Sequence, residues 1–217
     1  MLSIKKTFLL LLPKYHAAPS CLFALANREI SKVYKAATSQ KAWKINNYEK
    51  IGTVQGALLT YKSLQIVKPE LILNVGTCGA IHDCGIKALD IVRSNEFVIY
   101  HDRFSIEALE NYSVGKFPCE RLNFFKDAIP VIFGTSNSLI INQNNIESIK
   151  KYRVSCLDME AAAVAEVCQE EKIKFFALKV VTDIVSLNKN DSDIESQFVK
   201  NFKSAMEKIG VWAHNVK

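Results

Sequence analysis

Short apolar runs alternate along this chain with longer segments of helical spacing, and this alternation limits the possible folds more than any other feature. Each run is interpreted as a buried strand, because it is apolar on both faces and ends at turn residues or polar residues. The runs cover residues 8–12, 71–75, 91–92 with 97–100, 131–133 and 175–181. Strands alternating with helices at this spacing predict an α/β fold with a mostly parallel sheet.

Three segments between or after these runs are predicted to be helices. Residues 52–67 carry an imperfect apolar stripe, and residues 198–212 are amphipathic. Residues 159–171 are rich in alanine and follow Asp158, a residue type that often caps helix N-termini.

The charge of the chain favours neither nucleic acid nor a membrane as a partner. Its formal net charge is +6, yet the basic residues are scattered between acids and do not form the stripe typical of nucleic-acid-binding proteins. Diffuse charge of this kind mainly affects solubility. No apolar run approaches the ~18–20 residues that a membrane-spanning helix needs.

The first residues imitate a secretory signal peptide, since Lys5 and Lys6 precede the apolar run over residues 8–12. That run stops at Pro13 and is shorter than the roughly 7–15 residues typical of such peptides. A buried first strand of a parallel sheet gives the same pattern, and we favour this interpretation.

The six cysteines could form three disulfides, but a chain of 217 residues does not need them in order to fold. No two cysteines are separated by only two residues, as they are in many zinc sites. We therefore predict reduced thiols, no metal site and a cytoplasmic location.

Three short sequences stand where α/β sheets collect ligands, at the carboxyl ends of strands and the starts of helices. The first, Gly76-Thr77-Cys78-Gly79, follows a predicted strand. Its glycines can bring backbone N–H groups close to an anion or a sugar. A tight turn after the strand would explain the same glycines.

The other two sequences bring carboxylates. Asp158 and Glu160 stand at a predicted helix start, where acids are favoured simply as caps or by the helix dipole. The alternative is a carboxylate that accepts hydrogen bonds from two ribose hydroxyls. Asp183 follows Thr182 at a predicted strand end and is either exposed in a loop or held in a cleft. In a cleft, desolvation raises the pKa of the acid and allows it to serve as a general acid.

Residues 73–79, 100–103, 158–165 and 178–183 together resemble the nucleoside phosphorylase superfamily. Within it the chain looks most similar to 5′-methylthioadenosine/S-adenosylhomocysteine nucleosidases, particularly to their plant-type branch. The likeness runs from about Gly52 to the C-terminus. The Asp-Met-Glu helix start and the Val-Thr-Asp strand end, in this order and separation, make the resemblance specific.

The resemblance implies one nucleoside phosphorylase-like domain over residues 1–217, with a central mixed sheet flanked by helices. It implies a homodimer that needs no metal or other cofactor. It also implies hydrolysis of the bond between adenine N9 and the ribose of 5′-methylthioadenosine or a related 5′-substituted adenosine. The transition state of that reaction resembles an oxocarbenium ion, with negative charge moving into the purine.

The resemblance also assigns roles to residues of this chain. Asp183 matches the general acid that protonates the purine at N7, and Glu160 matches the acid on the ribose hydroxyls. The other substrate-binding positions are Thr77, Cys78 and Gly79 near the ribose and base, Leu139 and Ile140 against the base, Met159 against the sugar, Phe198 over the base and 5′ substituent, and Asp158 and Thr182 within the two acidic motifs. Leu139, Ile140 and Phe198 would fit equally well as core residues.

The N-terminal region, about residues 1–50, departs from the family pattern because it is shortened. The family's first strand leads to a glutamate that activates the attacking water, but no acid occurs between Met1 and Arg28. His16 falls at the place of that glutamate. It could act as the catalytic base, since the reference pKa of histidine is about 6.5, or it could be an exposed loop residue.

Two other functions stay open. A phosphorylase would use phosphate in place of water, and it needs a basic anion site near the sugar that the shortened region hardly offers. A non-catalytic nucleoside-binding module would keep Asp183 and Glu160 and lack water activation, in line with the missing glutamate.

Overall fold

The computed structural model describes residues 8–13, 43–48, 51–66, 69–103, 107–122, 127–138, 141, 143–187 and 194–215. Its strands are β1 (Phe8–Pro13), β2 (Trp43–Tyr48), β3 (Leu71–Ile81), β4 (Ile91–Tyr100), β5 (Lys116–Pro118), β6 (Ile129–Thr135), β7 (Cys156–Asp158) and β8 (Lys174–Val185). Its helices are α2 (Thr53–Ile66), α3 (Glu110–Ser113), α4 (Gln143–Lys151), α5 (Ala161–Glu170) and α6 (Ile194–Asn215), with a 3₁₀ turn η1 (Glu107–Leu109).

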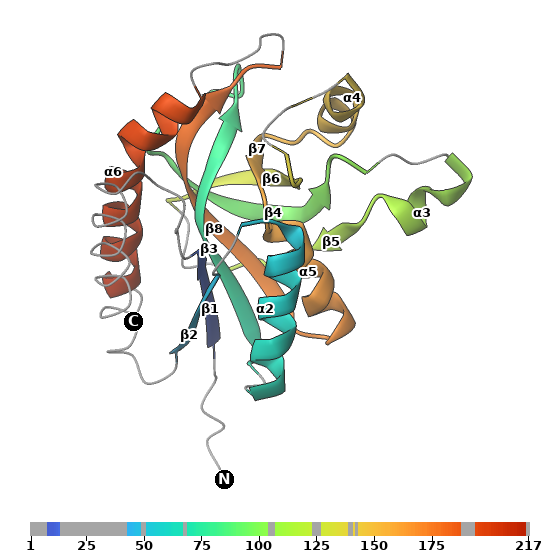
Figure 1. Cartoon of the computed structure of the whole chain (residues 1–217), viewed down its shortest axis with the longest axis vertical. Helices are drawn as coiled ribbons and strands as arrows, with labels where there is room; N and C mark the ends of the chain where they lie inside the picture. Colours follow the sequence, from blue (N-terminus) through green and yellow to red (C-terminus); the bar gives the residue numbers. More distant parts are fainter. Residues whose placement is uncertain are drawn as a thin grey trace.

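These eight strands form one sheet, with α6 on one side of it and α2 and α5 on the other (Figure 1). The strand order is β2-β1-β3-β7-β6-β4-β5, and β8 pairs with both β3 and β4. The pairs β1–β2, β1–β3, β3–β8, β4–β6 and β6–β7 are parallel, and the pairs β3–β7, β4–β5 and β4–β8 are antiparallel. The predicted mixed, mostly parallel sheet flanked by helices is therefore confirmed.

The N-terminal apolar run forms β1, as the strand interpretation predicted. β1 runs parallel to β3, with Phe8 opposite Leu71 and Leu11 opposite Asn74. Farther along the same edge of β3, the short strand β7 takes over and pairs with Gly79 and Ala80. Thus β3 has β8 along one edge, and β1 followed by β7 along the other.

β3 and β8 are both longer than the sequence predicted, and this corrects the position of two candidate motifs. The segment from Gly76 to Gly79 lies within β3 and not in a turn after it, and Thr182 and Asp183 lie within β8 and not beyond its end. The two strands pair from Leu71 to Ile81. Because this pairing satisfies their backbone hydrogen-bonding groups, residues that favour turns locally are held in an extended conformation.

The helix predicted over residues 159–171 begins two residues later, at Ala161. Its N-cap position is Glu160, whose side chain makes no capping hydrogen bond. The predicted C-terminal helix is confirmed within α6, whereas α3, α4 and η1 were not predicted. Among the described residues, no helix is both long and apolar enough to cross a membrane.

Helix α2 buries a face of mostly small or polar residues and exposes several large apolar ones. Its buried positions are mostly small or polar, namely Gly56, Thr60, Ser63 and Leu64. The apolar stripe that predicted this helix lies largely on the outside, where Val54, Leu58 and Tyr61 are exposed. The small inner face allows α2 to pack closely on α5, which itself buries a row of alanines.

We predict that Ala165→Leu lowers the free energy of unfolding by about 1–3 kcal/mol, since overpacking a tight core forces side chains and backbone to shift. Ala165 is buried on α5, and Gln169 on the same helix is exposed, so Gln169→Leu is the matched control. Urea denaturation of both variants measures the difference. Equal stabilities would show that the α5 interface has room for a larger side chain.

Candidate active site

The three sequence motifs meet at Gly79. On one edge of β3 this glycine pairs with Asp183 of β8, and on the other edge it pairs with Leu157, immediately before Asp158. A Cβ atom on Gly79 would lie 2.6 Å from Asp183 Oδ2 and 2.9 Å from Val185 Cγ2. The absence of a side chain at Gly79 therefore makes room for the Asp183 carboxyl group.

A register shift between β3 and β8 turns the Asp183 side chain to this position. Cys78 pairs with Val181, but the next residue, Gly79, pairs with Asp183, so Thr182 is left as the extra residue of a β-bulge. The Thr182 carbonyl accepts a 2.7 Å hydrogen bond from Asn201 Nδ2. The neighbouring Ile184 N–H donates to Gln197 Oε1 at 3.1 Å. Both partners belong to α6, which thus holds the bulge in place.

Asp183 is a buried acid with few compensating contacts. Its residue is 7% exposed, and Oδ1 accepts a 2.7 Å hydrogen bond from the Thr182 hydroxyl. Burial raises the pKa of Asp183, and the Thr182 hydrogen bond opposes this shift only in part. Asp183 is therefore in the buried environment that the sequence left as one of two possibilities, and it retains its proton at higher pH than an exposed aspartic acid does.

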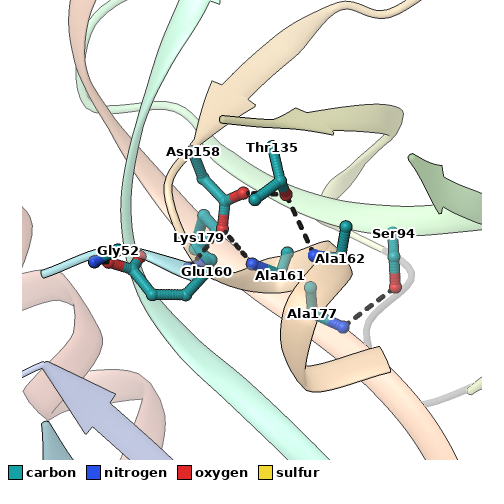
Figure 2. A network of polar contacts seen from close by, with 9 residues as sticks. All are labelled: Gly52, Ser94, Thr135, Asp158, Glu160, Ala161, Ala162, Ala177 and Lys179. Carbon is teal, nitrogen blue, oxygen red and sulfur yellow. Dashed lines mark hydrogen bonds and ion pairs between the residues drawn. The ribbon is translucent and has the colours of Figure 1, made fainter. Parts of the chain in front are cut away.

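Asp158 organises the start of α5 (Figure 2). Its Oδ2 accepts a 2.9 Å hydrogen bond from the Ala161 N–H, and its Oδ1 accepts one of 2.5 Å from the Thr135 hydroxyl. Thr135 Oγ1 in turn accepts from the Ala162 N–H at 2.9 Å. Two of the first N–H groups of α5 are thus satisfied from β6 and β7, which agrees with the capping interpretation of Asp158.

Asp158 also forms a buried ion pair with Lys179, whose Nζ lies 2.9 Å from Asp158 Oδ2. Burial by itself lowers the pKa of Lys179, but the carboxylates of Asp158 and Glu160 raise it above its ordinary value. The ammonium group therefore stays charged within the strand β8.

Glu160 is a second buried acid, 9% exposed, and it comes from the short link between β7 and α5. Its Oε1 accepts a 3.0 Å hydrogen bond from the Gly52 N–H, at the entry to α2. Burial raises the pKa of Glu160 and the charge of Lys179 opposes this rise, while the charge of Asp158 adds to it. The charge of Lys179 therefore acts on Glu160, whereas no cation among the described residues affects the pKa of Asp183.

The other predicted site residues are placed as follows. Thr77 and Cys78 lie in β3, Met159 precedes Glu160, and Phe198 lies in α6 with its ring 5.3 Å from that of Phe202. Cys78 is part of the hydrophobic core, and burial raises the pKa of its thiol well above the ordinary value. His16, Leu139 and Ile140 lie outside the described residues, so their roles stay predictions.

Several residues of this network were not among the predicted site residues. Lys179 is the most important of them, and its signal was a lysine within an otherwise apolar run. Thr135, Gln197 and Asn201 reach the network through contacts between distant segments. Among the described residues, no group of three or more His, Cys, Asp or Glu side chains is placed to hold a metal ion.

Known sequences match most of this chain. Residues 36–211 match the family model of the phosphorylase superfamily. A 5′-methylthioadenosine/S-adenosylhomocysteine nucleosidase of Arabidopsis thaliana is 32% identical over 169 residues, covering 74% of this chain and 63% of the relative. An Arabidopsis 5′-methylthioadenosine nucleosidase is 31% identical over 156 residues, covering 70% and 57%. The chain thus spans less than two thirds of the length of these relatives.

Comparisons with solved structures show the fold. The apo structure of Arabidopsis thaliana 5′-methylthioadenosine nucleosidase has a TM-score of 0.78 at 23% identity, covering 98% of this chain and 97% of the other. A nucleosidase structure from Borrelia burgdorferi with bound adenine has a TM-score of 0.71 at 18% identity, covering 95% and 97%. The expected nucleoside phosphorylase-like fold is therefore confirmed.

We predict that Asp183→Asn stabilises the protein more at neutral pH than at acid pH. The folded state binds the Asp183 proton more tightly than the unfolded state does, so protonation of Asp183 stabilises the fold. This stabilisation is complete below the unfolded pKa of about 3.9. It is lost as the pH rises through the folded pKa. Asparagine has no such proton, so the stability difference should move in favour of the variant between about pH 3.5 and pH 8.

Urea denaturation across this pH range tests the prediction. The control is Asp127→Asn, which changes an exposed acid. A stability difference for Asp183→Asn that does not vary with pH would contradict the raised pKa.

Proposed function

The chain belongs to the phosphorylase superfamily, and on this premise we propose that it is an adenine nucleoside N-glycosidase. Its substrate would be 5′-methylthioadenosine or a related 5′-substituted adenosine, whose N9–ribose bond it hydrolyses. The names of the Arabidopsis relatives support this class of reaction. The observation that carries the proposal is that Gly79 pairs with Asp183 on one side and stands beside the Asp158–Glu160 turn on the other.

The chemistry of the two buried acids fits this reaction. Asp183, whose pKa is raised by burial, would donate its proton to N7 of the purine as the C1′–N9 bond breaks and its electron pair moves into the base. The Thr182 hydroxyl, bonded to Oδ1, fixes the orientation of the carboxyl group. Glu160, when ionised, would accept hydrogen bonds from the ribose hydroxyls and stabilise the positive charge that develops on the sugar. Water then adds to C1′ and loses a proton.

The remaining substrate contacts are proposed from the resemblance. Thr77, Gly79 and Met159 would lie near the sugar and base, and Phe198 would cover the base and the 5′ substituent. Cys78, Asp158 and Thr182 would act mainly through the scaffold, since Cys78 is a core residue, Asp158 caps α5 and Thr182 forms the bulge. The roles of Leu139 and Ile140 at the base, and of His16 as the base that activates water, rest on the sequence alone.

We also propose that the protein is a homodimer that assembles through α2. Ile51, Val54, Leu58 and Tyr61 are 48%, 64%, 45% and 50% exposed and lie at helical spacing on one side of α2 and its entry. A contiguous exposed apolar stripe typically marks an interface. The opposite face of α2 is already packed on α5, so this stripe is available to a second copy.

We also propose that the protein is cytoplasmic. This location is supported by the five described cysteines, Cys78, Cys84, Cys119, Cys156 and Cys168, which are all unbridged. Reduced thiols are typical of cytosolic proteins.

We predict that the protein releases adenine from 5′-methylthioadenosine without phosphate, and that Asp183→Asn slows this release by about 10²–10⁴-fold. An amide cannot donate a proton as an acid does. Chromatography of free adenine measures the rate, and Asp127→Asn is the control. Release that requires phosphate would identify a phosphorylase, and nucleoside binding without release would identify a binding module. Near-normal release by folded Asp183→Asn would remove Asp183 from the acid role.

We predict that Leu58→Glu converts the dimer to a monomer, because it places a charge in the middle of the apolar stripe. Light scattering after size-exclusion chromatography measures the mass. The matched control is Val211→Glu, which alters another exposed apolar residue, 63% exposed, on α6. A wild-type protein that is monomeric at all concentrations, or a Leu58→Glu variant that stays dimeric, would contradict the interface.

A further inference from the structure

Lys179 is a buried cation for which the proposed reaction has no direct role. It lies in the middle of β8, between Leu178 and Val180, and is 2% exposed. Removing an ammonium group from water is strongly unfavourable unless partners compensate for the loss. An apolar residue would be expected here, because β8 has neighbouring strands on both edges. A lysine at this position therefore indicates a specific role.

The partners of Lys179 are two carboxylates. Asp158 forms the direct ion pair at 2.9 Å, and the charge of Glu160 acts on the ammonium group as well. This cluster thus contains one amine and two carboxyl groups. Asp158 is also committed to the Ala161 N–H and the Thr135 hydroxyl, whereas Glu160 receives the Gly52 N–H. Figure 2 shows these side chains together beside the first turn of α5.

We propose that Lys179 is a positioning residue for the ribose-binding carboxylate: its buried ammonium group keeps Glu160 ionised, so that Glu160 can accept hydrogen bonds from both ribose hydroxyls. This inference rests on the proposed function, because it assumes that Glu160 binds the sugar. It adds a determinant of ribose affinity and of its pH dependence.

The electrostatics give the direction of the effect. Burial raises the pKa of Glu160, Lys179 counteracts the rise, and Asp158 adds to it; the backbone N–H groups of Gly52 and Met159 also lower it. Buried His101 is a further titratable group near Asp158: burial lowers the pKa of His101, and the charges of Asp102 and Asp158 oppose that shift. Without Lys179 the pKa of Glu160 would rise further. A protonated Glu160 donates one hydrogen bond where an ionised one only accepts, so the ribose diol would lose an acceptor.

The test uses Lys179→Met with Lys179→Arg as the conservative variant. The probe is a 7-deaza analogue of 5′-methylthioadenosine, which lacks the N7 atom that is protonated and is therefore not consumed. We expect the affinity of Lys179→Met for this probe to fall by about tenfold for each pH unit below the shifted pKa and to recover at alkaline pH. Binding of free adenine, which has no ribose, should be unchanged. Lys179→Arg should restore the wild-type pH profile.

Two further variants separate this role from a structural one. The double variant Asp158→Asn/Lys179→Met removes both charges of the ion pair, and asparagine can still accept from the Ala161 N–H, so the fold should persist. Its pH profile should shift in the same direction as that of Lys179→Met but by less, because Lys179 lowers the pKa of Glu160 more than Asp158 raises it. In a Glu160→Gln background, Lys179→Met should not change ribose affinity further, because residue 160 no longer carries a titrating carboxyl group. A second loss of ribose affinity in that background would show that Lys179 acts by another route.

A readout independent of catalysis is the titration of the Glu160 carboxyl, followed by carbon-13 NMR in protein labelled at glutamate. The midpoint should move to higher pH in Lys179→Met. An unchanged midpoint together with an unchanged ribose affinity would overturn the inference even if adenine release is normal. Conversely, a shifted midpoint in a protein that releases no adenine would retain the charge relationship and refute the proposed reaction.

Discussion

The pairing of β3 with β8 is the constraint on which the candidate site depends. The two strands match residue by residue until Cys78, and a single extra residue, Thr182, then shifts the register. Without this bulge Asp183 would occupy the other face of β8, because the side chains of a strand alternate between faces. Gly79 is the counterpart of the bulge, since only a residue without a side chain leaves space for the Asp183 carboxyl group. Helix α6 stabilises the distortion through Asn201 and Gln197.

Burial raises the pKa of both acids of the site, but the groups that oppose this rise differ between them. Asp183 has a hydroxyl as its partner, so burial prevails and the carboxyl group tends to hold its proton. Glu160 has Lys179 nearby, and the ammonium charge opposes the effect of burial. Two buried acids are thereby suited to opposite tasks, proton donation and hydrogen-bond acceptance. Distinct environments for paired acids are a common way to divide the work of catalysis.

Helix α2 links the exposed apolar stripe to the same site. Gly52, directly before its first turn, donates a hydrogen bond to Glu160, and Gly56 lies close enough that its Cβ would be 3.4 Å from Glu160 Cβ. The inner face of α2 is therefore shaped by Glu160 and α5, which leaves Val54, Leu58 and Tyr61 outside. A partner bound to that stripe would contact the helix that positions one of the two acids.

The sequence by itself determined most of the described strands and the helices that cover the sheet. It also identified Asp158, Glu160 and Asp183 as the acids of interest. These features depend on local hydrophobic patterns and on motifs, both of which are contained within short segments. Only the tertiary structure decided the bulge at Thr182, the outward direction of the α2 stripe and the participation of Lys179, Thr135 and Asn201. Each of these depends on strand register, burial or charge between segments far apart in the chain. The pairing partner of a residue and the water it loses on folding are not local properties, so a local pattern could mark Lys179 as unusual but could not reveal which groups it contacts.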